Sequence, residues 1–428
     1  MRKRLCVLAS LGMTVALQSA SPVELAATQP MPLRAGFASA EISPGSDCVL
    51  FGYEFRGEKL APGNDGVHDH LQVRVLVLRR DKQTAAIASL DCAAIDLETV
   101  RGYRKAIAAA LDTDIAHVIV AATHTHSGAY MSPKILPQEV KGNPAVVKAT
   151  SAYGQTVRQK LLETAIRAGA LTFPVNLYYR EAPIGLGYNR RVDTAQGVRN
   201  CWSPQEWPER PPGPSPDPTC SVVMLKESIG SRSTLLWSLG VHPVVLGKTS
   251  NVVSADYPGR ACQLIEEMVP GSRSLFVLGG AGNIHPWIAT QDDPKAVETV
   301  ARSAASFVSL LSQGMTPAQD ADWRTAAATL KIGKYELDVA VWRIGPVWFV
   351  AAPVELFAEL SASLRQRLKG PVLLATMANG WCGYFPTRAA FAEGGYEVDE
   401  QLNSKNLAPG DGERLVDELV KLAETVKE

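Results

Sequence analysis

Two histidines separated by one residue follow an apolar, β-branched run. Residues 118–128 read VIVAATHTHSG, and His124 and His126 come directly after the run. Residues i and i+2 of an extended chain point to the same face, so both imidazoles can approach one metal ion or one substrate group. Imidazole nitrogen is a common zinc ligand. The pattern indicates a metal site, with ordinary hydrogen-bonded histidines as the alternative.

A third histidine stands in a similar place. The apolar run that ends at Leu239 leads into Gly240-Val241-His242-Pro243. Because α/β proteins place their sites at strand ends, His242 is a further candidate ligand. Asp256 follows shortly afterwards, just before an expected helix. Its carboxylate is expected either to orient a ligand histidine or to cap that helix.

Oxygen donors occur later in the chain. Glu355 closes the apolar segment 350–354, where it is either a metal ligand or a negative charge at a helix N-terminus. Residues 379–397 show neither helical nor strand periodicity, and glycines flank Tyr384 and Tyr396. This composition favours a loop shaped around a ligand.

Three other segments carry weaker signals. His68 and His70 are also two apart, but they precede a strand instead of ending one. Arg190 and Arg191 lie in a loop, which is either a binding loop or a solvated basic loop. The glycine-rich segment 279–286 has neither the dinucleotide-binding spacing nor a phosphate-loop lysine, which argues against nucleotide binding.

The elements that must position these residues alternate along the chain. Apolar runs typical of buried strands lie at 72–78, 84–90, 117–122, 221–225, 234–239, 274–278, 340–344 and 347–351. Helical patterns lie at 97–110, 145–168, 258–268, 294–312, 355–368 and 412–427. The alternation predicts an α/β fold, with mixed sheets covered by helices. The proline-rich stretch 204–218 is expected to be a surface loop, so we expect a single large catalytic domain.

Composition excludes several classes of protein. The 428 residues include 43 Lys and Arg against 43 Asp and Glu, and 46% are hydrophobic. Zero net charge argues against a nucleic-acid partner, which usually requires a clearly basic surface. The hydrophobic content argues against an intrinsically disordered chain.

The N-terminus predicts export. Basic residues at 2–4 precede an apolar run at 5–17 and then small residues up to Ala27. This is the pattern of a signal peptide over 1–27, with a buried N-terminal helix as the alternative. The mature chain, 28–428, is then expected to be periplasmic or secreted, without a transmembrane segment. Export permits disulfides, and Cys201 and Cys220 flank the proline-rich loop, so we expect them to be bridged.

Several of these motifs together resemble one family. From about residue 35 to residue 400, the chain resembles the neutral/alkaline, non-lysosomal ceramidase family. The resemblance rests on GFASAEISP at 36–44, GVHD at 66–69, ATHTHSG at 122–128, NR at 189–190, VHP at 241–243, GAGN at 280–283, PVE at 353–355 and GYFPT at 383–387.

The resemblance implies a zinc-centred site. It implies a Zn²⁺ ion held by four side chains: His124, His242, Glu355 and Tyr384. It also implies three catalytic residues: His126 bonded to the reacting group or the zinc-bound water, Arg190 in contact with substrate, and Tyr396 facing the developing oxyanion. Zinc lowers the pKa of bound water to about 7, and the resulting hydroxide can attack a carbonyl carbon.

The expected activity is therefore zinc-dependent hydrolysis of N-acyl bonds, with a ceramide-like lipid cleaved to a fatty acid and a sphingoid base. We do not expect the C-terminal β-sandwich domain of the family, and this chain departs from the family at Asn283 and His285. A non-lipid amide, an ester or a sugar-linked substrate on the same core stays open. Contact with a membrane surface is also left open. An alternative of a different class is an exported binding protein with a structural zinc.

Overall fold

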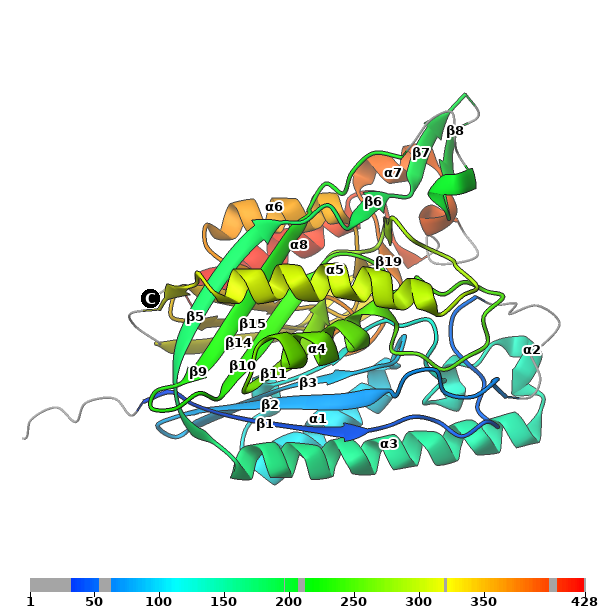
Figure 1. Ribbon diagram of the computed structural model, residues 1–428. Helices are drawn as coiled ribbons and strands as arrows, with labels where there is room; N and C mark the ends of the chain where they lie inside the picture. The colour runs from blue at the N-terminus through cyan, green and yellow to red at the C-terminus, as the bar shows by residue number, and fades with distance from the viewer. Residues whose placement is uncertain are drawn as a thin grey trace, which may run out of the picture. The chain divides into compact units, whose positions relative to one another are not determined.

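Strand β2 (Gln72–Arg80) carries apolar side chains on both of its faces. Val73 and Val75 pack on one side and Leu76 and Leu78 on the other, and all four are buried. Such a strand must be covered on both sides. The computed structural model, which describes residues 32–53, 63–195, 197–206, 212–318, 322–399 and 406–426, shows these two covering layers (Figure 1).

The strand lies in a large mixed sheet. In spatial order its strands are β11 (Ser272–Leu278), β10 (Ser233–Leu239), β9 (Thr219–Glu227), β5 (Phe173–Pro183), β1 (Arg34–Glu41), β2, β3 (Gln83–Leu90) and β4 (Val118–Ala122), and β13 (Thr316–Pro317) also pairs with β5. Two pairs are parallel: β3 with β4, joined through α1 (Leu97–Leu111), and β10 with β11, joined through α4 (Asp256–Met268). The loops that follow β4 and β10 therefore leave from the carboxyl ends of these two parallel pairs.

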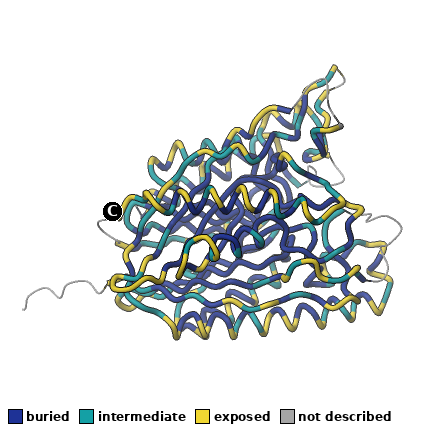
Figure 2. Tube along the Cα trace, viewed as in Figure 1, coloured by how far each residue is buried: buried dark blue, intermediate teal, exposed yellow. Residues whose placement is uncertain are grey.

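Residues 32–428 form one compact unit built in four layers. Helices α1, α3 (Pro144–Ala170), α4 and α5 (Lys295–Ser312) cover one face of the large sheet. Its other face packs on a second sheet, β14 (Trp323–Ile332), β15 (Tyr335–Ile344), β16 (Val347–Ala351) and β18 (Val372–Ala375). That sheet is backed by α6 (Ala358–Leu368) and α8 (Asp411–Glu424). Figure 2 shows the buried residues concentrated in the strands and on the inner sides of the helices.

Short elements connect these layers. Within the described ranges, the small strand pairings are β6 (Gly187–Asn189) with β12 (Ile284–Pro286), β7 (Arg191–Thr194) with β8 (Gly197–Asn200), and β17 (Glu355–Leu356) with β19 (Tyr384–Phe385). Short helices there include α2 (Gln138–Lys141), α7 (Arg388–Glu393) and single 3₁₀ turns at Ile115–His117, Pro133–Ile135, Pro204–Glu206 and Tyr396–Val398.

The two edges of the large sheet approach each other. The Ser89 hydroxyl of β3 donates to the Phe276 carbonyl of β11 over 2.6 Å. The segment after β18 bonds to both edges, because Thr376 N donates to Leu278 O and Asn379 N to Val120 O, each over 2.7 Å. The loops after β4 and β10 are thereby brought to one place.

The expected α/β fold, with mixed sheets in one large domain, is confirmed. The helix expected from Glu355 begins later, and this part of the prediction is wrong. Glu355 N donates to Gly383 O over 2.8 Å, so Glu355 and Leu356 form β17, and α6 begins at Ala358. Strands β5 and β14 were not expected from the sequence, because both expose part of one face and lack a continuous apolar run.

The expected disulfide between Cys201 and Cys220 is not formed. Cys220 lies in β9 and points into the core beneath the helices, whereas Cys201 packs with Tyr188 and Val192 in a separate small cluster. Cys201 Sγ donates to Ser203 O over 3.3 Å, and burial raises the pKa of Cys220 to about 12.

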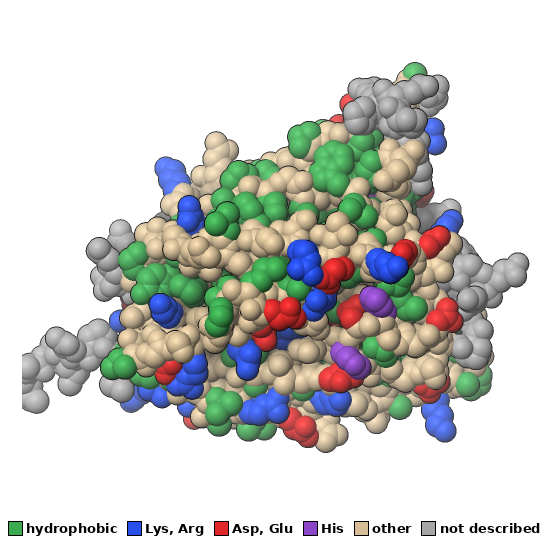
Figure 3. All heavy atoms as spheres, in the orientation of Figure 1, with side chains coloured by type: hydrophobic (Ala, Val, Ile, Leu, Met, Phe, Trp, Pro, Cys, Tyr) green, Lys and Arg blue, Asp and Glu red, His purple; other side chains and the backbone are tan. Residues whose placement is uncertain are grey.

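The predicted signal peptide, residues 1–27, lies outside the described residues. None of the helices in the described ranges has the length and apolarity needed to cross a membrane. On the face shown in Figure 3, basic and acidic side chains are interspersed without an extended patch of one sign, in line with the balanced composition.

Candidate metal centre

His124 stands in the turn directly after β4. Its φ of 71° lies in the left-handed region, which is uncommon for a residue with a side chain and is often found at functional sites. Its backbone N–H donates to Cys92 O over 2.8 Å, and its Nδ1 donates to Ala93 O over 2.6 Å. The end of β3 thus holds both the backbone and the ring of His124.

His242 is held in the same way from another strand. It follows β10, is 1% exposed, and donates from Nδ1 to Ala281 O over 2.6 Å. Burial lowers the pKa of His242 to about 4, so its ring is neutral near pH 7. Asp256 does not orient this ring. Its carboxylate accepts the N–H groups of Val245, Leu246 and Tyr257, and so fastens the loop after His242 to the start of α4.

The two rings turn their other nitrogens toward each other. A carbonyl oxygen can only accept, so each Nδ1 carries a proton, and Nε2 is the nitrogen of each ring that is left to bind a metal. The Nε2 atoms of His124 and His242 lie 3.1 Å apart. Two ligands of a tetrahedral zinc ion, at ~2.0–2.1 Å each, would lie about 3.3 Å apart.

Glu355 completes this convergence. Its Oε2 lies 3.2 Å from His242 Nε2 and 3.4 Å from His124 Nε2. Burial acts to raise the pKa of Glu355, but the neighbouring histidines hold it well below its ordinary range. Its other oxygen, Oε1, accepts the indole N–H of Trp381 over 2.9 Å. Within the described residues, buried Oε2 receives no hydrogen bond.

These atoms fit a metal ion. Two imidazole nitrogens and a carboxylate oxygen converge in a buried space, where buried polar groups need a partner and a bound cation would supply one. Imidazole and carboxylate are the donors of a transition-metal site. His124, His126 and His242 also place ring nitrogens within 4.8 Å of one another, a cluster that could hold a metal ion.

His126 is the most exposed of these three histidines. Its Nε2 lies 3.4 Å from His124 Nε2. Its ring lies against the backbone of Gly52, where an added Cβ would come within 2.5 Å of His126 Nδ1. Gly52 also has a φ of 78°, which favours glycine. Both the close approach of His126 and the backbone conformation therefore require a residue without a side chain here. Phe51 and Tyr53 present ring contacts to His126 at 6.4 and 5.3 Å between centroids.

Both candidate tyrosines lie beside the cluster. Tyr384 is paired in register with Glu355 across the two short parallel strands, which brings both side chains to one side. Burial, with the nearby charge of Glu355, raises the pKa of Tyr384 well above its ordinary range. The Tyr396 ring lies 5.8 Å from the Tyr384 ring and is 38% exposed. Tyr396 is therefore accessible from solvent, whereas Tyr384 is not.

Arg190 is buried, and its guanidinium bonds to other residues of the same chain. Its Nε donates to Glu397 over 2.7 Å, and the other two nitrogens reach His285 Nε2 and Gly282 O, each over 2.8 Å. Its Cζ lies 5.5 Å from the Tyr384 ring centre and 5.7 Å from that of Tyr396. The geometry indicates that Arg190 braces the two tyrosines.

Sequence reasoning missed two residues of this site. Trp381 bonds to Glu355, and Glu397 is a buried carboxylate that accepts from Arg190, Arg191 and Asn200. Both lie in the segment without periodicity, where the sequence offers no pattern that separates a buried side chain from a solvated one.

The remaining candidates lie elsewhere or serve the fold. His68 and His70 are exposed, and His70 Nδ1 pairs with Glu41 over 2.8 Å. Asn283 accepts the N–H of Ala358 over 2.9 Å and so caps the start of α6. It does not contact the histidine cluster through any described hydrogen bond.

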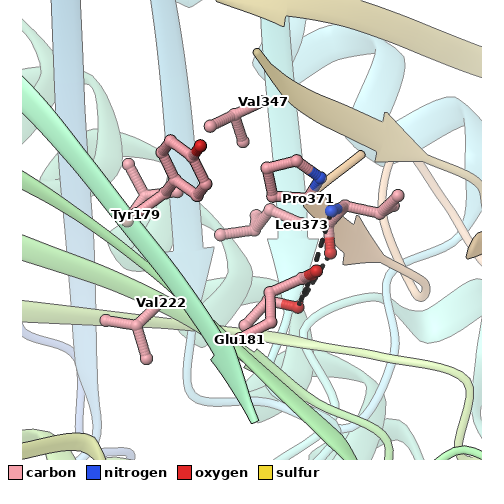
Figure 4. A pocket seen from close by; sticks show the side chains of 9 residues that line it. Tyr179, Glu181, Val222, Val347, Pro371 and Leu373 are labelled. Atoms are coloured by element: carbon pink, nitrogen blue, oxygen red, sulfur yellow. Dashed lines mark hydrogen bonds between the residues drawn. The ribbon is translucent and has the colours of Figure 1, made fainter. Parts of the chain in front are cut away.

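A small crevice between the two sheets is a separate feature (Figure 4). It has an empty volume of about 140 Å³ and is lined by residues such as Tyr179, Val347 and Leu373. Its charged member, Glu181, accepts from Ser221 Oγ and Val372 N, so its carboxylate is used within the fold. None of the candidate site residues lines it.

Comparisons with known proteins agree with this fold. No protein-family model matches the sequence, and no curated protein matches it. A solved neutral ceramidase from Pseudomonas aeruginosa superposes with a TM-score of 0.72 at 16% identity, over 92% of this chain and 74% of that one. A structure described as ceramidase complexed with C2 gives 0.70 at 17% identity, over 92% and 75%. The chain therefore has the fold of neutral ceramidase structures, as the sequence motifs led us to expect.

Proposed function

We propose that this protein is a zinc-dependent hydrolase of N-acyl bonds, with ceramide-like lipids as its first substrate class. The observation that carries the proposal is the meeting of His124 Nε2, His242 Nε2 and Glu355 Oε2 within 3.1–3.4 Å of one another. Tyr384 is assigned as the fourth ligand because it pairs in register with Glu355. Zinc is assigned as the metal because it prefers this mixture of nitrogen and oxygen donors in a tetrahedral arrangement.

The substrate class is supported by the likeness in fold. Both matched structures are described as ceramidases, and the likeness extends over 92% of this chain. Two groups of aromatic side chains contact the candidate site residues. Phe51, which also contacts Trp381, lies against His126, and Tyr396, which also contacts Trp202, lies against Tyr384. Aromatic side chains of this kind suit an apolar acyl chain.

The reaction adds water across the N-acyl bond. A C–O bond forms, the C–N bond breaks, and the products are a carboxylic acid and an amine. When bound, zinc supplies the Lewis acidity that activates water and polarises the carbonyl group. His126 takes the proton of the attacking water and returns it to the leaving amine, because it is the least buried of the three clustered histidines.

One further residue acts on the carbonyl oxygen, and another holds that residue in position. The Tyr396 phenol is partly exposed beside the cluster and donates a hydrogen bond to the developing negative charge. Arg190 holds Tyr396 and Tyr384 at 5.5–5.7 Å from its guanidinium carbon, so its role is to position these rings.

The test combines metal analysis with a substrate panel. The purified protein is assayed on fluorescent ceramide, short N-acyl amines and short esters, and its zinc content is measured. We expect stoichiometric zinc and turnover of ceramide. His242→Ala should lose both, whereas His70→Ala, at an exposed histidine paired with Glu41, should keep both.

The panel also separates the alternatives. Turnover of the short compounds alone would reject the lipid substrate and retain the hydrolase. Bound zinc without turnover of any compound would instead favour a binding protein with a structural zinc. A parent protein that binds no zinc would reject the proposed site.

We also propose that the protein is exported. The support is the charged, apolar and small-residue pattern of residues 1–27. N-terminal sequencing of the protein recovered outside the cytoplasm should show that this segment has been removed. An intact N-terminus on protein retained in the cytoplasm would reject export.

A further inference from the structure

Trp381 contacts a candidate metal ligand directly. Its indole N–H donates to Glu355 Oε1 over 2.9 Å, and its ring meets the Phe51 ring edge-to-face with centroids 5.9 Å apart. Indole nitrogen is a donor only, so this bond has one direction. Trp381 therefore binds one of the two oxygens of Glu355 and leaves the other toward the histidines.

The chain around Trp381 is tightly constrained. Gly380 has a φ of 137°, and an added Cβ there would lie 2.3 Å from Leu97 Cδ2. Cys382 N donates to Pro353 O over 2.8 Å, which ties this segment to the strand end that leads to Glu355. The indole is thus held at a set distance from the carboxylate.

We infer that Trp381 is a positioning residue that makes Glu355 a one-oxygen metal ligand. Two observations lead to this: Oε1 is occupied by the indole N–H, and Oε2 lies 3.2 and 3.4 Å from the two Nε2 atoms. A carboxylate that could bind through both oxygens would fill an extra coordination position. The indole bond keeps that position open for water or substrate, as catalytic zinc sites require. This inference rests on the proposed metal-dependent function.

A competing explanation is that Trp381 only fills space beside Phe51. Two substitutions separate these roles. Trp381→Phe keeps an aromatic ring and removes the N–H donor. Phe51→Leu removes the aromatic partner of Trp381 and keeps the N–H donor.

The measurements are the zinc dissociation constant, from competition with a chelator, and the visible absorption of the cobalt-substituted protein. Trp381→Phe should bind zinc ~10–100-fold more weakly, as is usual when a residue that orients a ligand is lost. Its cobalt spectrum should shift toward the weaker absorption of a higher coordination number. Phe51→Leu should retain the parent's affinity and spectrum.

A second pair of variants tests the same hydrogen bond. Its result does not depend on whether the single variant Trp381→Phe folds as well as the parent. In Glu355→Gln, the Trp381 N–H should capture the amide oxygen and turn the amide NH₂ toward the histidines, which opposes metal binding. In Glu355→Gln/Trp381→Phe the amide can rotate. The double variant should therefore bind zinc more tightly than Glu355→Gln alone.

Three results would overturn the inference. These are parent affinity and spectrum in Trp381→Phe, equal weakening in Trp381→Phe and Phe51→Leu, or a double variant no tighter than Glu355→Gln. Any of them, with stoichiometric zinc in the parent, leaves the proposed function standing. A parent that binds no zinc overturns both.

Discussion

Arg190 and Glu397, 207 residues apart in the chain, form an ion pair with side chains only 2% and 0% exposed. Glu397 also accepts from Arg191 and Asn200, and Asn200 in turn accepts the backbone N–H of Tyr396 over 3.1 Å. This network joins the β7–β8 hairpin to the segment that carries Tyr396. The proposed oxyanion donor is therefore held in place by a buried carboxylate.

Glu397→Gln should destabilise the protein by ~3–5 kcal/mol at neutral pH, because it leaves the buried Arg190 without its counter-charge. Denaturant unfolding measures this. Glu393→Gln is a matched control on the same segment, since Glu393 pairs with Arg191 at 3.1 Å but is 45% exposed. It should cost no more than ~1 kcal/mol. An equal decrease in the free energy of unfolding in the two variants would show that the buried ion pair stabilises the protein no more than the exposed one.

The penalty of Glu397→Gln should depend on pH. Burial acts to raise the pKa of Glu397, but Arg190 and Arg191 hold it below its ordinary value of 4.5. A lowered carboxyl pKa contributes stability that is present above 4.5 and is lost as the pH falls through the folded-state value. The difference between parent and variant should therefore be largest near pH 7 and shrink below pH 4.5. A constant difference across this range would contradict the pairing.

His124→Ala and His242→Ala should each remove bound zinc and abolish turnover, because each deletes a nitrogen that faces Glu355 Oε2. Metal analysis after dialysis, alongside the His70→Ala control, checks this. A full zinc complement in both variants would refute the ligand assignment.

His126→Gln should keep zinc and lower kcat by ~10²–10⁴, the usual contribution of a general acid–base group. The structure makes this a sharp test, because His126 Nε2 lies within 3.4 Å of His124 Nε2 and could itself bind the metal. Loss of zinc in His126→Gln would make His126 a ligand and remove it as the base.

Tyr396→Phe and Tyr384→Phe should fail in different ways. Tyr396→Phe should retain zinc and lose ~10²–10³ in kcat with little change in KM, because its hydrogen bond forms only with the developing oxyanion. Tyr384→Phe should release zinc more readily to a chelator. The assignments fail if Tyr396→Phe sheds the metal while Tyr384→Phe holds it.

Most of the long strands and helices could be predicted from the sequence, because the spacing of apolar residues along a segment shows whether it is a strand or a helix and which face it buries. The runs at 72–78 and 347–351 lie within β2 and β16 as expected. The prediction went wrong at Glu355, where a backbone hydrogen bond to Gly383 keeps the chain extended. That partner is distant in sequence, so no local pattern could reveal it.

The sequence by itself determined which candidate ligand and catalytic residues follow apolar strands: His124 and His126 after β4, His242 after β10, and Glu355 after β16. Only the tertiary structure decided that these ends meet, since β4 and β10 stand near opposite ends of the strand order and are brought together by the approach of the sheet's two edges. It also decided that Trp381 and Glu397 belong to the site and that Cys201 and Cys220 stay apart. The physical reason is that burial and hydrogen-bond partners are set by packing between distant segments, whereas periodicity records only the environment along one segment.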